Sequence, residues 1–226
     1  MIVANGGQVN STEAYTTRGR GPNCHGTLLL AHGAGAPADS SFMTTLAEAM
    51  ADQGVTVVRF DFPYMQRRKA DGRKRPPDRA EKLLTFFREQ VDLAREVSEG
   101  GPLFIGGKSM GGRMASLLAS ESEMEGAFSG AIGFGYPFHP PGKLDRWRTD
   151  HFPALWTKLC IIQGTRDPFG KFDEVVAHLG SEPMLELHWL DGGNHDFQPL
   201  KSSGRTQQQL IEEAASHAGR FIRGCD

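Results

Sequence analysis

The most constraining feature of this sequence is a serine flanked by glycines, placed between a strand pattern and a helix pattern. Residues 107–111 read Gly-Lys-Ser-Met-Gly, follow the apolar run 103–105 and precede a segment with apolar residues at helical spacing. In this context G-x-S-x-G predicts a sharp strand-to-helix turn with the serine at its apex. Strand and helix crowd the positions two before and two after the serine, and Gly107 and Gly111 are small enough to fit there.

Strand and helix patterns alternate along the rest of the chain. Apolar residues at helical spacing separate the strand patterns, for example Phe42, Leu46 and Met50. Since parallel strands need crossover connections, we predict an α/β fold with a mostly parallel central sheet of about 6–8 strands and helices on both faces. The strand patterns occupy residues 27–31, 55–60, 103–105, 131–134, 159–163 and 185–190.

The two ends of the chain carry weaker or simpler patterns. A last helix is predicted over roughly 206–222, with Leu210, Ala214 and Ala218 on one stripe that packs on the sheet. Residues 1–24 are rich in Gly, Thr and Asn, and predict one or two weak edge strands at most.

Size and composition are typical of one soluble domain. A chain of 226 residues can bury one substantial core, so we expect residues 1–226 to form a single domain. The net charge of −2 gives no general reason to bind nucleic acid or an anionic membrane. The first residues lack a signal-peptide pattern and no segment is apolar enough to span a membrane, so we expect a cytoplasmic protein.

Three cysteines, Cys24, Cys160 and Cys225, stand far apart in the sequence. They contain no C-x-x-C pair of the kind that holds zinc or forms a redox dithiol. The simplest interpretation is three reduced thiols, with no metal site.

Two further polar residues follow separate strand patterns. Asp167 comes directly after the strand pattern 159–163, and His195 follows the last strand pattern. A loop aspartate is commonly only a turn former, and a loop histidine commonly has no special role. The order Ser, Asp, His, each after its own strand, instead favours a catalytic triad at one edge of the sheet. We predict Ser109 as nucleophile, Asp167 as orienting carboxylate and His195 as general base.

A second glycine-rich segment follows the first central strand pattern. Residues 32–36 read His-Gly-Ala-Gly-Ala, and small residues there let backbone N–H groups approach a substrate. We predict that Ala34 N–H and Met110 N–H form an oxyanion hole, and that Gly33 contacts the substrate.

Two nucleotide-binding motifs compete with this interpretation. Residues 33–38 fit G-x-G-x-x-[GA], with Asp61 at a plausible distance for a ribose, but Pro37 interrupts the loop ahead of the helix pattern. Residues 107–109 resemble the end of a phosphate-binding loop, but its first glycine would fall at Pro102. Neither motif explains both Ser109 and His195.

Taken together, these motifs resemble the alpha/beta-hydrolase superfamily over nearly the whole chain, particularly testis-expressed hydrolase-like proteins and dienelactone hydrolases. The resemblance implies the alpha/beta-hydrolase fold. It also implies the same triad roles for the serine of GKSMG, the aspartate of GTRDP and the histidine of GGNHDF, with the HGAG segment as oxyanion loop. It does not identify a substrate.

Features around the predicted site bear on the substrate. Only about two dozen residues separate the strand pattern 131–134 from the strand pattern 159–163, which is too few for a large lid domain. Trp147 is a candidate to line an acyl pocket, although packing of its own loop is the alternative. Arg67 and Arg68 begin a segment, 67–79, with seven basic and two acidic residues, which predicts attraction of anionic substrates or else a solvated loop.

The predicted function is that of a serine hydrolase that cleaves an ester or thioester of a small, possibly anionic, acyl substrate. An acyl-enzyme mechanism needs no metal or organic cofactor. The alternative is a non-catalytic module that keeps the fold and binds a partner or small ligand. The sequence predicts no nucleic-acid or membrane partner and leaves the oligomeric state open.

Overall fold

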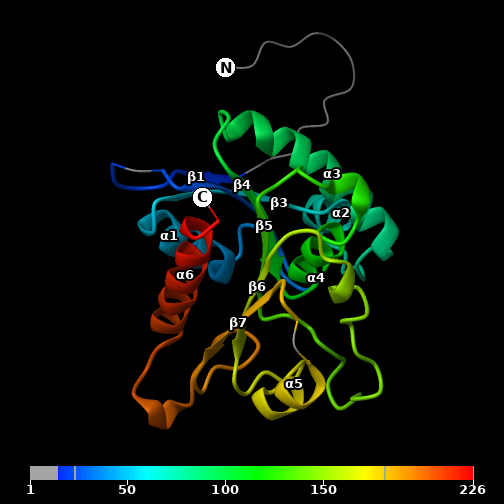
Figure 1. Cartoon of the computed structure of the whole chain (residues 1–226), viewed down its shortest axis with the longest axis vertical. Coiled ribbons are helices and arrows are strands. Elements are labelled where there is room, and N and C mark those ends of the chain that lie inside the picture. The colour runs from blue at the N-terminus through cyan, green and yellow to red at the C-terminus, as the bar shows by residue number, and fades with distance from the viewer. Residues whose placement is uncertain (1–14, 23, 181, 226) are drawn as a thin grey trace.

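A seven-stranded sheet forms the centre of the protein, as seen in a computed structural model that describes residues 15–22, 24–180 and 182–225 (Figure 1). The strand order is β1-β3-β2-β4-β5-β6-β7, and all neighbouring pairs are parallel except β1 with β3. The predicted mostly parallel sheet is confirmed. The strands are β1 (Tyr15–Thr17), β2 (Gly26–Ala31), β3 (Val55–Phe60), β4 (Leu103–Lys108), β5 (Gly130–Phe134), β6 (Leu159–Gly164) and β7 (Leu185–Leu190).

Helices cover both faces of the sheet, as predicted (Figure 1). The first and last helices, α1 and α6, pack against each other on one face, whereas α2, α3 and α4 cover the other. The α-helices are α1 (Ser41–Asp52), α2 (Pro63–Asp71), α3 (Ala80–Val97), α4 (Met110–Leu118), α5 (Phe172–His178) and α6 (Gln207–Arg223). Short 3-10 helices occupy Ser122–Met124, Phe152–Ala154 and Lys201–Ser203.

The sheet separates two hydrophobic cores. Along β2, Leu28 and Leu30 face the core under α1 and α6, while Leu29 and Ala31 face the core under α3 and α4. All residues of β2, β3, β4 and β6 are buried. Because both faces are covered, these strands are continuous apolar or small-residue runs in the sequence rather than alternating ones.

The predicted C-terminal helix begins at a well-defined cap. Thr206 Oγ1 accepts a hydrogen bond from Gln209 N–H at 3.2 Å, and the Gln209 side chain accepts one from Thr206 N–H at 2.9 Å. This capping box satisfies two N–H groups at the start of the helix. The stripe of Leu210, Ala214 and Ala218 is fully buried, which confirms the predicted packing on the sheet.

The weak N-terminal pattern yields one edge strand in the part of the chain that the structure describes. β1 pairs with β3 through three residue pairs, Tyr15 with Arg59 being the first. Residues 1–14 and 23 of the segment predicted from 1 to 24 lie outside the described residues.

The connection between β5 and β6 folds down onto the body of the protein. Tyr136 Oη donates to the Arg148 carbonyl at 2.9 Å, and Ser116 Oγ lies 2.8 Å from His151 Nε2. Phe152 is 2% exposed. The predicted absence of a large lid domain is therefore confirmed.

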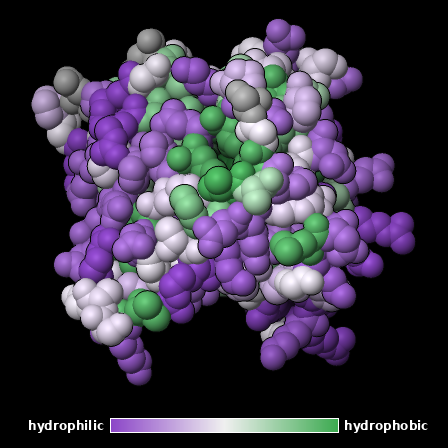
Figure 2. Space-filling view, turned by 60° about the horizontal axis from the view of Figure 1, so that its bottom comes forward, coloured by the Kyte–Doolittle hydropathy of each residue, from purple (hydrophilic) through white to green (hydrophobic). Residues whose placement is uncertain are grey.

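Most large apolar side chains are inside, but some reach the surface. A space-filling view shows apolar side chains gathered near the middle of one face, with hydrophilic side chains around them (Figure 2). Phe172 and Val176 of α5 are among the large hydrophobic residues that stay exposed. Among the described helices, none combines the length and apolar character needed to cross a membrane.

Candidate active site

The turn between β4 and α4 holds Ser109 in a strained backbone conformation. Its φ and ψ are 51° and −113°. Two backbone hydrogen bonds fix it there: Ser109 N–H donates to Phe134 O, and Ser109 O accepts from Arg113 N–H, both at 3.0 Å. A non-glycine residue tolerates this geometry only where its surroundings impose it, which is common at functional sites.

The crowding predicted around this turn is present. A Cβ atom on Gly107 would lie 2.4 Å from the backbone carbon of Gly111, and a Cβ on Gly111 would lie 2.5 Å from the carbonyl oxygen of Ala31. Real Cβ atoms essentially never approach backbone so closely. The two glycines therefore allow α4 to start directly against the ends of β4 and β2.

Three side chains from three different loops form one chain of hydrogen bonds. His195 Nε2 lies 2.9 Å from Ser109 Oγ, and His195 Nδ1 lies 2.8 Å from Asp167 Oδ2. The loops follow β4, β6 and β7, so the parallel sheet brings their ends to one edge. The Asp167 side chain is fully buried, whereas 19% of the His195 side chain is exposed.

The hydrogen bonds of Asp167 indicate which ring nitrogen of His195 carries the proton. Asp167 Oδ2 also accepts from Gln163 Nε2 at 2.9 Å, and Oδ1 accepts from Phe169 N–H at 2.8 Å. An ionised carboxylate only accepts hydrogen bonds, so the contact with His195 requires the proton on Nδ1. His195 Nε2 is then the acceptor that faces the Ser109 hydroxyl.

Side chains of α2 contact the carbonyl groups of the glycine-rich loop after β2. Tyr64 Oη contacts the carbonyl oxygens of Ala34 at 3.0 Å and Gly33 at 3.3 Å, and Arg68 donates to the Gly35 carbonyl at 2.9 Å. In a trans peptide the C=O and N–H groups point in opposite directions. Because the Gly33 carbonyl faces Tyr64, the N–H of Ala34 points away from α2.

His32 fixes the start of the same loop. Its Nδ1 lies 2.6 Å from the Gly33 carbonyl, and its Nε2 accepts from Phe62 N–H at 3.1 Å. Burial lowers the pKa of His32, so the ring stays neutral and can donate at one nitrogen while accepting at the other. The loop is thereby tied to both β3 and α2.

A cavity of about 330 Å³ opens at Ser109 and His195. Gly33 and Ala34 form part of its wall, whereas Met110 stands at the N-terminus of α4, where helix N–H groups have no partner within the helix. The cavity is lined by Gly33, Ala34, Gly35, Ala36, Ser40, Phe42, Met43, Lys108, Ser109, Phe169, His195 and Asp196.

Three residues near the triad had no role in the sequence-based prediction. The Phe169 ring packs 4.4 Å from the His195 ring, and Gln163 binds Asp167. The Lys108 side chain is 8% exposed, and its Nζ lies 3.3 Å from Asp196 Oδ1; burial lowers its pKa. Of these three residues, only Lys108 carries a signal in the sequence. It stands at the end of a buried strand, and buried lysines are rare without a charged partner.

Trp147 does not line the Ser109 cavity. Its ring stacks on His178 of α5, with centroids 3.6 Å apart and planes at 4°, and also contacts His139. It packs against the core under α3 and α4. The structure therefore places Trp147 as a packing residue of the loop between β5 and β6, which was the alternative interpretation of the sequence.

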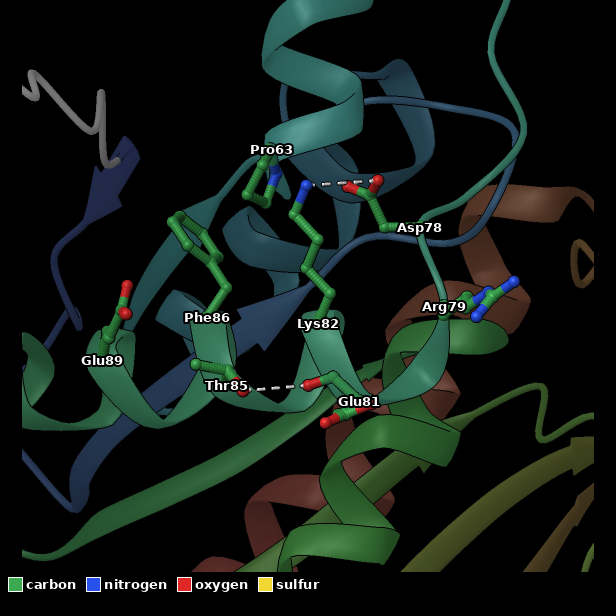
Figure 3. A pocket seen from close by; sticks show the side chains of 8 residues that line it. All are labelled: Pro63, Asp78, Arg79, Glu81, Lys82, Thr85, Phe86 and Glu89. Atoms are coloured by element: carbon green, nitrogen blue, oxygen red, sulfur yellow. Dashed lines mark hydrogen bonds and ion pairs between the residues drawn. The ribbon is translucent and has the colours of Figure 1, made fainter.

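The basic segment reaches the candidate site through one of its residues. Arg68 contacts the Gly35 carbonyl, which belongs to the cavity wall, whereas Arg67 pairs with Asp78 at 3.0 Å. Asp78 lies on a second, open groove of about 610 Å³ between α2 and α3 (Figure 3). That groove is lined by Pro63, Asp78, Arg79, Glu81, Lys82, Thr85, Phe86 and Glu89.

Asp61, which fitted a dinucleotide motif, supports the loop instead. Its Oδ1 accepts from Ala38 N–H at 2.7 Å, and its Oδ2 lies 3.0 Å from Lys69 Nζ. α1 begins only at Ser41, beyond the glycines of the loop. Both carboxylate oxygens of Asp61 are thus engaged by the protein itself.

Comparison with known proteins gives one family over most of the chain. A family model described as an alpha/beta hydrolase domain matches residues 25–223.

Solved structures with the same fold cover nearly the whole chain. A dienelactone hydrolase from Anabaena variabilis has a TM-score of 0.70 at 17% identity, over 93% of this chain and 90% of that one. Est1E from Butyrivibrio proteoclasticus has a TM-score of 0.69 at 14% identity, over 93% and 94% of the two chains. XC6422 from Xanthomonas campestris, described as an a/b serine hydrolase without lid, has a TM-score of 0.64 at 18% identity, over 92% and 88%.

Among curated proteins, the following match covers a short stretch of the chain. A UDP-N-acetylglucosamine 2-epimerase from Neisseria meningitidis serogroup B is 34% identical over 64 residues. The match covers 28% of this chain and 16% of that protein, so the chain spans about a sixth of that relative's length.

The close contacts of Gly111 predict a large effect of a single methyl group on stability. We expect Gly111→Ala to lower the free energy of unfolding by about 3 kcal/mol or more, because its Cβ would meet the backbone of Ala31. Gly35→Ala is the control, since a Cβ there meets nothing within 4 Å. Urea unfolding followed by circular dichroism measures both, and equal stabilities of the two variants would contradict the proposed crowding.

Proposed function

Because the chain belongs to the alpha/beta hydrolase family, we propose that it is a serine hydrolase that cleaves an ester or thioester of a small acyl substrate. The observation that carries this proposal is the hydrogen-bonded chain from Ser109 through His195 to Asp167. The cavity of about 330 Å³ at Ser109 is large enough for a small acyl group and its leaving group.

In the proposed first step, Ser109 Oγ attacks the carbonyl carbon of the substrate while His195 Nε2 accepts the hydroxyl proton. The carbonyl π bond opens and leaves a negative charge on its oxygen. Ala34 N–H and Met110 N–H are the proposed donors to this oxyanion. The assignment of Ala34 is supported by the direction of its N–H, which points away from α2. The assignment of Met110 is supported by its position at the start of α4, because the N-terminal end of a helix favours negative charge.

In the following steps the intermediate collapses and the enzyme is restored. The bond to the leaving group breaks, and His195 returns its proton to that group, so an acyl-Ser109 ester remains. A water molecule then attacks this ester while His195 Nε2 accepts its proton. The bond between the acyl carbon and Ser109 Oγ breaks, His195 returns the proton to Oγ, and the carboxylic acid leaves. Asp167 stabilises the imidazolium formed in each half-reaction, and its two other hydrogen bonds keep it in place.

An ester-type bond is the proposed target for two reasons. The cleft is open, without a large lid that would exclude water, and water is the second substrate of hydrolysis. One structural neighbour is named a dienelactone hydrolase, and a lactone is a cyclic ester.

An anionic substrate is part of the same proposal. The segment 67–79 carries seven basic and two acidic residues. Asp71 pairs with Arg75 and Asp78 pairs with Arg67, so the acidic residues offset part of the positive charge. Within this segment Arg68 reaches the Gly35 carbonyl beside the cavity, where its charge can attract carboxylated substrates.

Loss of the Ser109 hydroxyl should remove activity without affecting the fold. We expect wild-type protein to hydrolyse short activated esters and to react covalently with a fluorophosphonate probe at Ser109. Ser109→Ala should lose both, with a melting temperature nearly unchanged, because the serine makes no core contact that alanine cannot make. Initial rates, mass spectrometry of the probe adduct and thermal melts measure these effects. No labelling of folded wild-type protein would favour the non-catalytic alternative, whereas labelling at another residue would show that the nucleophile is misassigned.

Asp167→Asn should lower kcat by about 10⁴-fold, because an asparagine amide can hold His195 in the wrong tautomer. The expected change in stability is much smaller than this loss. Asp145→Asn is the matched control: its side chain is 76% exposed and pairs with Arg146, so kcat should be unchanged. Steady-state kinetics compare the variants, and a larger loss in Asp145→Asn would show that the acid is misassigned.

Removal of four positive charges should affect carboxylated esters selectively. We expect the combined replacement of Arg67, Arg68, Arg73 and Arg75 by glutamine to lower kcat/KM several-fold for a carboxylated ester and much less for its neutral analogue, which loses only the support that Arg68 gives to the Gly35 carbonyl. Added salt should have the same effect on the wild type, since surface fields are screened within about 10 Å at 0.1 M. Equal changes for both esters would exclude steering by this segment.

A further inference from the structure

A second cluster of reactive side chains lies on β6 and β7, away from Ser109. The potential ligand atoms of Cys160, Glu186 and His188 all lie within 4.8 Å of one another. Cys160 stands opposite Glu186 in the parallel register of the two strands. Glu186 and His188 are two residues apart, so they share one face of β7, and His188 Nε2 lies 2.5 Å from Glu186 Oε1.

A second imidazole approaches this cluster from α6. The His217 ring lies 4.2 Å from the His188 ring, with the planes at 34°. Arg220 engages His217 Nδ1 at 2.8 Å, so coordination by His217 would use Nε2. Two strands therefore bring a thiol, a carboxylate and an imidazole together, and the covering helix places a second imidazole against the first.

We propose that Cys160, Glu186 and His188 bind Zn²⁺, with His217 as the fourth ligand. Zinc takes this combination of sulfur, oxygen and nitrogen ligands in tetrahedral sites, whereas Mg²⁺ and Ca²⁺ prefer oxygen ligands alone. Zinc–ligand bonds of about 2.0–2.3 Å place tetrahedral donors within about 4 Å of one another. The three ligand atoms, all within 4.8 Å of one another, are already close to that spacing. Binding forms a Zn–S bond and releases the thiol proton of Cys160 to solvent.

The position of the cluster indicates a structural role for the metal. Cys160 and Glu186 are the second residues of β6 and β7, whereas Asp167 and His195 follow the opposite ends of these strands. Among the strands that the structure describes, β7 lies at the edge of the sheet and pairs with β6 alone. A metal shared by β6, β7 and α6 would fasten this edge strand without contacting the substrate. The proposal is therefore independent of the function proposed for Ser109.

Cobalt titration of the reduced, untagged full chain tests the site directly. After treatment with a chelator, Co²⁺ should bind in a 1:1 ratio, with the visible absorption of tetrahedral cobalt and an ultraviolet thiolate-to-metal charge-transfer band. Zn²⁺ should displace it, because zinc outcompetes cobalt in tetrahedral thiolate sites. Cobalt binding without a thiolate band, or no binding, would overturn the proposal.

Variants assign the ligands. Glu186→Gln and His188→Gln should each weaken Zn²⁺ binding by at least about tenfold, and Cys160→Ser should abolish the charge-transfer band. The Glu186 and His188 side chains are 46% and 24% exposed, so these two variants should fold even if substitution of the buried Cys160 is disruptive. Cys24→Ser is the matched control, because Cys24 is an exposed thiol elsewhere in the chain. Zn²⁺ binding to Cys24→Ser should be unchanged, and loss of Zn²⁺ binding in this variant would place the metal at another site.

Thermal melts give a second readout. At a hundredfold excess over its dissociation constant, Zn²⁺ should raise the melting temperature of the wild type by about 5–10 °C. His188→Gln should show no such shift under the same conditions. An equal shift in the wild type and in His188→Gln would contradict a site built from these residues.

Discussion

The close approach of α4 to the ends of β4 and β2 is the constraint on which the rest of the site depends. It is possible only because Gly107 and Gly111 have no side chains, so strand and helix backbones nearly touch. The chain between them must turn within one residue, and Ser109 takes a positive φ as a result. The cost of that conformation is offset by the two buried cores on either side of the sheet. The hydroxyl is thereby presented at the sheet edge rather than packed inside.

The site is assembled by parallel strands that end at a common edge. Residues 86 positions apart, Ser109 and His195, meet at hydrogen-bond distance because their loops follow parallel strands of one sheet. The buried Asp167 carboxylate accepts hydrogen bonds from its own strand and loop, so it forms a fixed support for the His195 imidazole. On the other side of the cavity, Tyr64 and Arg68 of α2 donate hydrogen bonds to the carbonyl groups of the loop after β2. One helix thus links the basic segment to the backbone that borders Ser109.

The sequence predicted the sheet well because the central strands, β2 to β6, are buried on both faces. Six apolar runs became β2 to β7, and the helical stripe of Leu210, Ala214 and Ala218 became the buried face of α6. Motif order placed Ser109, Asp167 and His195 after three separate strands. Local patterns carry this information, because hydrophobic period and glycine spacing reflect the immediate surroundings of each residue.

The sequence by itself therefore determined the fold class, the sharp turn at Ser109 and the polar residues at the strand ends. Tertiary structure alone decided which side chains meet across the chain. Gln163 and Phe169 reach the triad, Trp147 instead stacks on His178, and Cys160 lies beside Glu186 and His188. No spacing in the sequence encodes these contacts, because they depend on strand register and on how helices pack across the sheet. Such arrangements are fixed by the global packing of the chain rather than by neighbouring residues.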